Sequence, residues 1–142
     1  MREGQAPATD QSAAQELDAL LTGIYGAMNC NLFNSELPGI RVQFTSGARY
    51  AGVTQVNNGE VTGILRNADT IRGDSTEARA DYLAGILLHE MIHVYCIING
   101  IPHYIGGKHT PEFIEAAADH GLFYDDFGNT NFLMADRAEI LK

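Results

Sequence analysis

The spacing of hydrophobic and polar positions changes along this chain and predicts an order of helices and strands. From about Ser12 to Asn29 the apolar residues recur every three or four positions, which is typical of a helix with one buried face. The residues of that face are Leu17, Leu20, Leu21, Ile24 and Met28. Residues 40–45 alternate between apolar and polar side chains and predict a half-buried strand. Residues 50–56 and 60–66 predict two more strands, joined across Asn57-Asn58-Gly59 as a hairpin.

The longest apolar stretch, residues 82–98, predicts a buried central helix, because it contains no proline and is apolar on nearly every side. Asp74 is expected to be the N-cap of this helix, with Glu77 at the third helical position. Asn99 and Gly100 are expected to end it.

A third helix is expected to start at Thr110 as N-cap, with Pro111 in its first turn. It should end near His120, where Gly121 stops it. Beyond this helix the chain is aromatic and acidic, and a short helix is expected over residues 131–141. The aromatic residues Phe123, Tyr124 and Phe127 are expected to pack in the core.

The order of helix, strands and helices predicts an α+β fold, in which a small antiparallel sheet packs with the central helix and its flanking helices. A chain of 142 residues is long enough for one domain with one hydrophobic core. Residues 1–11 are expected to be a flexible leader, and residues 12–142 a single domain.

The central helix carries His89, Glu90 and His93, which form an HExxH pattern. Residues four apart on a helix lie on the same face, so both imidazoles can bind one zinc ion at about 2.0–2.1 Å. Glu90 lies beside them without being a ligand, which suits a general base that takes a proton from zinc-bound water. Polar groups inside so apolar a helix are costly unless they are paired or bind a metal. The pattern therefore predicts a zinc metallopeptidase.

A catalytic zinc takes three protein ligands and keeps one position open. Three residues beyond the central helix are candidates for the third ligand: His109, His103 and Glu115. His109 is favoured, because the preceding Gly106-Gly107 pair lets the chain turn back over the metal. His103 is expected to be a loop residue. Glu115 would instead make a glutamate-ligand zinc peptidase, with Asp119 orienting a histidine.

Four segments resemble, in order, the successive motifs of SprT-like/Spartan zinc metalloproteases: residues 31–44, 51–53, 87–95 and 107–113. The resemblance implies a zincin-like metalloprotease domain in which His109 joins His89 and His93 as a zinc ligand. It also implies that Glu90 is catalytic, that the substrates are proteins or peptides, and that these substrates can be bound to DNA. Family members that repair DNA–protein crosslinks usually add a zinc ribbon or a basic region, and these 142 residues contain neither.

The charge of the chain opposes tight DNA binding, since 18 acidic and 9 basic residues give a formal net charge of −9. The arginines at 41, 49, 66, 72 and 79 are expected to be solvated surface residues. No apolar run is long enough for a membrane span without interruption by the HExxH residues, so no membrane association is expected. Because the N-terminus is polar and lacks a signal-peptide core, an intracellular protein, cytoplasmic or nuclear, is expected.

Other chemistry-bearing residues favour structural roles. Cys30 and Cys96 are too few for a disulfide framework or a four-cysteine zinc site and are expected to be buried thiols. His120 is expected to interact with the C-terminal end of the third helix. Tyr104 and Tyr124 could donate a hydrogen bond to an oxyanion, although packing roles are favoured. A non-catalytic zinc-bound recognition domain is the alternative to an enzyme, and the presence of Glu90 favours the enzyme.

Overall fold

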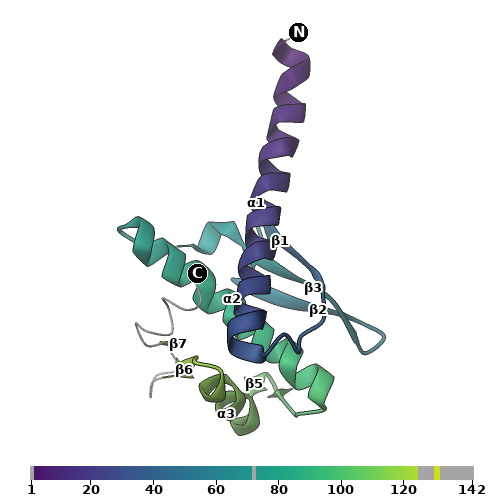
Figure 1. Cartoon of the computed structure of the whole chain (residues 1–142), viewed down its shortest axis with the longest axis vertical. Coiled ribbons are helices and arrows are strands. Elements are labelled where there is room, and N and C mark those ends of the chain that lie inside the picture. The colour runs from purple at the N-terminus through teal and green to yellow at the C-terminus, as the bar shows by residue number, and fades with distance from the viewer. Residues whose placement is uncertain (1, 72, 125–129, 132–142) are drawn as a thin grey trace.

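The computed structural model of the chain describes residues 2–71, 73–124 and 130–131. Its helices are α1 (Arg2–Phe33), α2 (Thr76–Asn99) and α3 (Pro111–Asp119), and a 3₁₀ turn spans Ala68–Thr70. Its strands are β1 (Arg41–Thr45), β2 (Gly52–Asn57), β3 (Glu60–Asn67), β4 (Tyr104–Ile105), β5 (Lys108–His109), β6 (Phe123–Tyr124) and β7 (Thr130–Asn131). This is the predicted α+β fold with a small sheet (Figure 1).

The main sheet has the strand order β1-β3-β2 and is mixed, so the prediction of an antiparallel sheet was wrong. β1 pairs with β3 in parallel, whereas β2 and β3 are antiparallel. The chain leaves β1 and enters β2 at the same end of β3, so the connection passes around that end. Asn67 holds this connection, because its side-chain amide donates to the carbonyls of Ala48 and Tyr50 at 3.0 and 2.9 Å. Alternation of side chains does not reveal the direction of pairing, which depends on such distant contacts.

The predicted hairpin between β2 and β3 is confirmed. Asn58 and Gly59 connect the two strands with φ angles of 54° and 81°. Positive φ at both central residues is what a type I′ turn requires, and Asn-Gly meets that requirement. β2 lies close to α2: a Cβ on Gly52 would lie 3.2 Å from Cγ of Glu90. Glycine at this position therefore lets the strand approach the central helix.

Helix α1 extends beyond the predicted residues 12–29 at both ends. Residues 2–11, expected to be a flexible leader, are helical, and half of them are alanine, glutamine or glutamate, which favour helix. The N-terminal half of α1 projects away from the rest of the molecule (Figure 1). Leu17 and Leu20, predicted to be buried, are consequently 52% and 61% exposed, and the buried face begins at Leu21.

The C-terminal half of α1 covers the outer edge of β1. Thr22 donates its hydroxyl proton to the carbonyl of Val42 at 3.2 Å, and the carboxylate of Asp18 accepts from the N–H of Phe44 at 3.0 Å. These side chains pair backbone groups that an edge strand would otherwise leave open. Cys30, predicted to be buried, is exposed, because it lies two positions beyond the buried Met28 and so on the other side of the helix.

Helix α2 is the buried central helix that the sequence predicted. Its N-cap is Ser75, whose hydroxyl oxygen accepts from the N–H of Ala78 at 3.0 Å, and not Asp74 as predicted. Both residue types cap helices well, so composition alone did not separate the two neighbours. Gly100 ends the helix in the left-handed region with φ 66°, as predicted. In the described part of the chain, α2 is long and apolar enough to cross a membrane, a test that core helices also pass.

The core lies where α1, the main sheet, α2 and α3 meet. Its largest fully buried apolar side chains are Phe33, Phe113, Leu21, Met28, Ile64, Leu87, Leu88, Met91, Ile92 and Leu122. Arg66, expected at the surface, is also fully buried. Its guanidinium donates to the carbonyls of Ala51, Asn67 and Tyr82, so a buried cation is satisfied by backbone oxygens and links β3 to α2.

Helix α3 begins after Thr110 as predicted, and Gly121 follows its C-terminal end with φ 91°. Phe123, predicted to be in the core, is 39% exposed in the short β6–β7 sheet. Phe127, Arg72 and positions 132–141 of the predicted last helix lie outside the described residues.

Candidate metal centre

Helix α2 places His89 and His93 one turn apart on the same face, as the HExxH spacing predicted. Their ring centroids lie 4.9 Å apart. Both histidines are half-buried, whereas the neighbouring Leu88 and Ile92 are completely buried. The histidine face therefore lies at the border of the core, where segments after α2 can reach it.

A tight hairpin brings the third histidine to this face. β4 and β5 pair with His109 opposite Tyr104, and the turn between them is Gly106-Gly107, with φ angles of 61° and 80°. Two consecutive positive φ angles are easily adopted only by residues such as glycine, so the predicted return of the chain at this pair is confirmed.

Thr110 fastens the base of the hairpin to α3. Its hydroxyl oxygen accepts from the N–H of Phe113 at 3.0 Å and donates its proton to the carbonyl of Pro102 at 2.6 Å. Its own N–H donates to the carbonyl of His103 at 3.2 Å. Thr110 thus holds both ends of the hairpin that carries His109.

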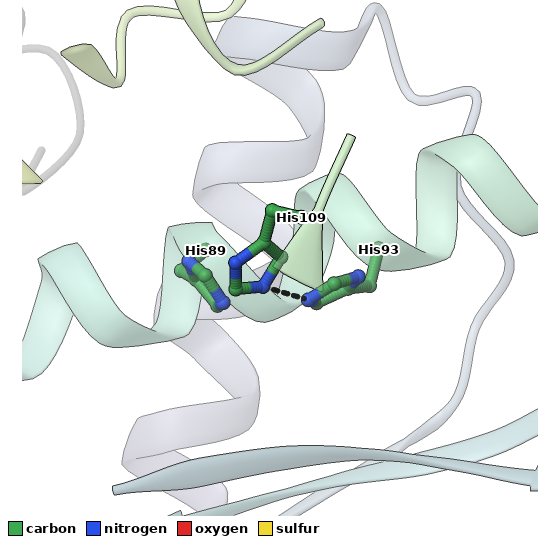
Figure 2. Close-up of side chains that lie close together, drawn as sticks. All are labelled: His89, His93 and His109. Carbon is green, nitrogen blue, oxygen red and sulfur yellow. Dashed lines mark hydrogen bonds between the residues drawn. The ribbon is translucent and has the colours of Figure 1, made fainter. Parts of the chain in front are cut away.

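The three predicted ligands lie together (Figure 2). One nitrogen of each of His89, His93 and His109 lies within 4.8 Å of the others, so the three residues could hold a metal ion. Nε2 of His109 is 3.2 Å from Nε2 of His93. Figure 2 shows His89 and His93 rising from α2, with His109 reaching between them from β5.

Phe113 supports the three imidazoles from α3. Its completely buried ring lies 5.2 Å from His89, 4.4 Å from His93 and 4.6 Å from His109, measured between ring centroids. Packing of this kind restricts the rotation of each imidazole. The cluster is therefore built on a rigid base that the first turn of α3 provides.

The histidines of the cluster are neutral near pH 7. Burial lowers the pKa of His89 to about 4 and that of His93 to about 3, because a charged imidazolium is poorly solvated there. Burial also lowers the pKa of His109. A neutral imidazole has a free nitrogen lone pair, which is what metal coordination requires.

Glu90 lies beside the cluster without joining it. Its side chain is buried, and Oε2 is 3.9 Å from Nε2 of His89. Burial raises the pKa of Glu90 to about 7, against the opposing effects of hydrogen bonds from Thr54 and of the positive charge of Arg66. Between about pH 4 and pH 7 both His89 and Glu90 are mainly neutral, so their contact in the metal-free protein is not an ion pair.

Thr54 on β2 anchors this carboxyl group. Its hydroxyl is 2.8 Å from Oε1 of Glu90 and 3.0 Å from the Glu90 carbonyl oxygen. With Oε1 held by the sheet, Oε2 is the oxygen that faces His89. No pattern in the sequence singled out Thr54, because its contact joins residues 36 positions apart.

The other predicted candidates lie at varied distances from the cluster. Glu115 is exposed on α3 and, among the described residues, does not belong to the metal-binding group. Tyr104 is 54% exposed, with its ring 5.1 Å from that of His109. His120 caps the C-terminal end of α3, and its Nδ1 is 2.7 Å from the carbonyl of Ala116, as its predicted position at the helix end implies. The side chain of Tyr124 lies outside the described part of the chain.

Comparison with protein-family models, curated proteins and solved structures finds no match to this chain. The function of the site is therefore inferred from its residues, its geometry and the sequence motifs that contain it.

Proposed function

We propose that this chain is a zinc-dependent metallopeptidase of the SprT-like type with a zincin-like fold, in which Glu90 is the general base. The observation that carries the proposal is the placement of a buried carboxyl group 3.9 Å from one of three converging imidazoles, but outside the metal-binding group. A structural metal site needs no such carboxyl group, whereas metal-assisted hydrolysis can use one as the general base that moves a proton.

The donor set fits zinc. Two nitrogens that each lie about 2.05 Å from a tetrahedral ion are separated by about 3.3 Å. The distance of 3.2 Å between Nε2 of His93 and Nε2 of His109 is close to this value. Three neutral imidazoles also leave a fourth position open, which is typical of catalytic zinc and not of structural zinc.

When bound, zinc supplies Lewis acidity that lowers the pKa of water and polarises a carbonyl. Peptide hydrolysis adds the hydroxyl of water to the carbonyl carbon and breaks the C–N bond, while the leaving nitrogen gains a proton. Oε2 of Glu90 faces the cluster and carries that proton from the water to the nitrogen. The pKa of Glu90 is about 7 in the metal-free protein, and a zinc ion beside it would lower this pKa, so that the group would be a carboxylate able to accept the proton near neutral pH.

The four SprT-like motifs support the same activity, since they contain His89, Glu90, His93 and His109. By that resemblance the substrates are proteins, including proteins bound to DNA. The net charge of −9 argues that the chain itself holds DNA weakly. A glutamate-ligand peptidase is less well supported, because Glu115 is exposed and stands outside the metal-binding group.

The test combines metal analysis with digestion of casein and of histones, each with and without single-stranded DNA. We expect one zinc per chain and proteolysis that falls at least about a hundredfold in Glu90→Gln, which keeps its zinc but has no carboxylate to accept a proton. Stoichiometric zinc in a His89→Ala/His93→Ala double variant would contradict the metal site. Wild-type cleavage by Glu90→Gln would contradict the role of Glu90, and a zinc-loaded wild-type protein without cleavage would favour a recognition domain.

A further inference from the structure

The imidazole of His93 has a second histidine partner that is not a metal ligand. Nδ1 of His93 lies 2.7 Å from Nδ1 of His103, and the ring centroids are 5.0 Å apart. The other nitrogen of the same ring, Nε2, lies 3.2 Å from Nε2 of His109. The two nitrogens of His93 therefore have different neighbours: Nε2 faces His109, another member of the metal-binding group, and Nδ1 faces His103.

The chemistry of coordination fixes the protons along this contact. A nitrogen that binds a metal must offer a lone pair, so the proton of a neutral His93 resides on Nδ1. Nδ1 of His93 then donates, and Nδ1 of His103 must accept. His103 consequently carries its own proton on Nε2. A carboxylate or a carbonyl oxygen commonly accepts this hydrogen bond in metal sites, and here an imidazole lies in its place.

The backbone holds His103 in position for this task. The carbonyl of His103 accepts from the N–H of Thr110 at 3.2 Å, and the carbonyl of the preceding Pro102 accepts from the Thr110 hydroxyl at 2.6 Å. His103 thus belongs to the same fastened hairpin as His109, although it is not one of the three residues of the metal-binding group. Both ring nitrogens of His93 therefore lie close to histidines of this one hairpin.

We propose that His103 is a positioning residue of the metal centre, which accepts the Nδ1 proton of His93 and so keeps Nε2 directed at the metal. This inference rests on the metal centre of the proposed function. It predicts that the hydrogen-bond acceptor at position 103 matters and that the imidazole itself does not.

Two substitutions separate these possibilities. In His103→Asn the side-chain oxygen occupies about the place of Nδ1 and can accept the same hydrogen bond, whereas His103→Leu keeps the bulk and loses the acceptor. Affinity for Co²⁺ alone, followed by its visible absorption bands, should fall roughly 10–100-fold in His103→Leu and should stay near the wild-type value in His103→Asn. Ile105→Ala, at a 67% exposed position of the same hairpin, is the control and should not change the affinity.

Long-range ¹H–¹⁵N spectra of the zinc-loaded wild-type protein provide a readout independent of folding in the variants. They should show His93 protonated at Nδ1 and His103 protonated at Nε2. Equal Co²⁺ affinity in wild type and His103→Leu, an Asn variant as weak as the Leu variant, or a His103 that is itself metal-bound would each overturn the role of His103. Absence of Co²⁺ binding by the wild-type protein would instead contradict the metal centre itself.

Discussion

Among single residues, Thr54 has the most direct contact with Glu90, the proposed general base. In Thr54→Val the shape is kept but the hydroxyl that contacts Oε1 of Glu90 is lost. Because hydrogen bonds from Thr54 lower the pKa of Glu90, the pKa should rise further above about 7 in this variant. The fold should lose about 1 kcal/mol, the usual contribution of one hydrogen bond. A ¹³C NMR titration of the Glu90 carboxyl group in the metal-free protein measures the shift.

Thr62→Val is the matched control, since the Thr62 hydroxyl contacts only the carbonyl of Gln55 among the described residues, at 3.4 Å on the exposed side of the hairpin. It should leave the titration of Glu90 unchanged. A Glu90 pKa that does not move in Thr54→Val would show that the hydroxyl does not control this carboxyl group.

Which single residues could be predicted depended on how far apart their contacts lie in the sequence. His89 and His93 follow from helix geometry alone, and His109 from a Gly-Gly turn directly before it. The contact of Thr54 with the Glu90 carboxyl group comes from a strand that is far from α2 in the sequence, so no local sequence pattern predicts it. The prediction that Arg66 lies at the surface was wrong for a related reason. Its charge is satisfied by backbone carbonyls of separate segments, and the sequence does not reveal that these segments lie beside it.

At the scale of elements, the β4–β5 hairpin and α3 act as one unit through Thr110. Thr110→Val removes the hydroxyl that caps α3 and holds Pro102, so it should destabilise the protein by about 1–2 kcal/mol. Because the hairpin also carries His109, the variant should bind zinc at least several-fold more weakly. Urea unfolding of the metal-free protein and a competitive zinc titration measure the two effects.

Ser75→Ala separates the capping effect from the metal effect. Ser75 caps α2 through the N–H of Ala78, and neither residue belongs to the metal-binding group. This variant should lose comparable stability while retaining wild-type zinc affinity. If Thr110→Val and Ser75→Ala affected zinc affinity equally, the hairpin would have no special part in building the site.

Elements that are determined locally were predicted well. The Asn58-Gly59 turn, the Gly100 helix end and the Thr110 cap each depend on residues within a few positions, and all three are confirmed. The direction of β1 relative to β3 was predicted wrongly. It depends on the connection between β1 and β2, which is held by Asn67 at the C-terminal end of β3. The start of α1 was also predicted wrongly, at residue 12 instead of residue 2. Helix formation in residues 2–11 continues from a packed segment that lies later in the chain.

For the whole molecule, the pKa shifts of His89 and His93 and that of Glu90 make stability depend on pH in opposite directions. The pKa values of His89 and His93, about 4 and about 3, lie below the ordinary value of 6.5. Their contribution to stability is therefore present above pH 6.5 and is lost as the pH falls towards these values. The pKa of Glu90, about 7, lies above its ordinary 4.5, so its contribution is present below pH 4.5 and is lost as the pH rises through about 7.

Acidification of the metal-free protein should therefore lower the free energy of unfolding, because two histidines lose their contributions while one carboxyl group gains its own. In Glu90→Gln the opposing gain is absent, so the loss between about pH 7 and about pH 4.5 should be steeper than in wild type. Urea unfolding at several pH values in the presence of a chelator measures both slopes, with Glu115→Gln at an exposed position as control. Parallel slopes in wild type and Glu90→Gln would show that Glu90 titrates like an exposed carboxyl group in the metal-free protein, and they would contradict the raised pKa that its burial implies.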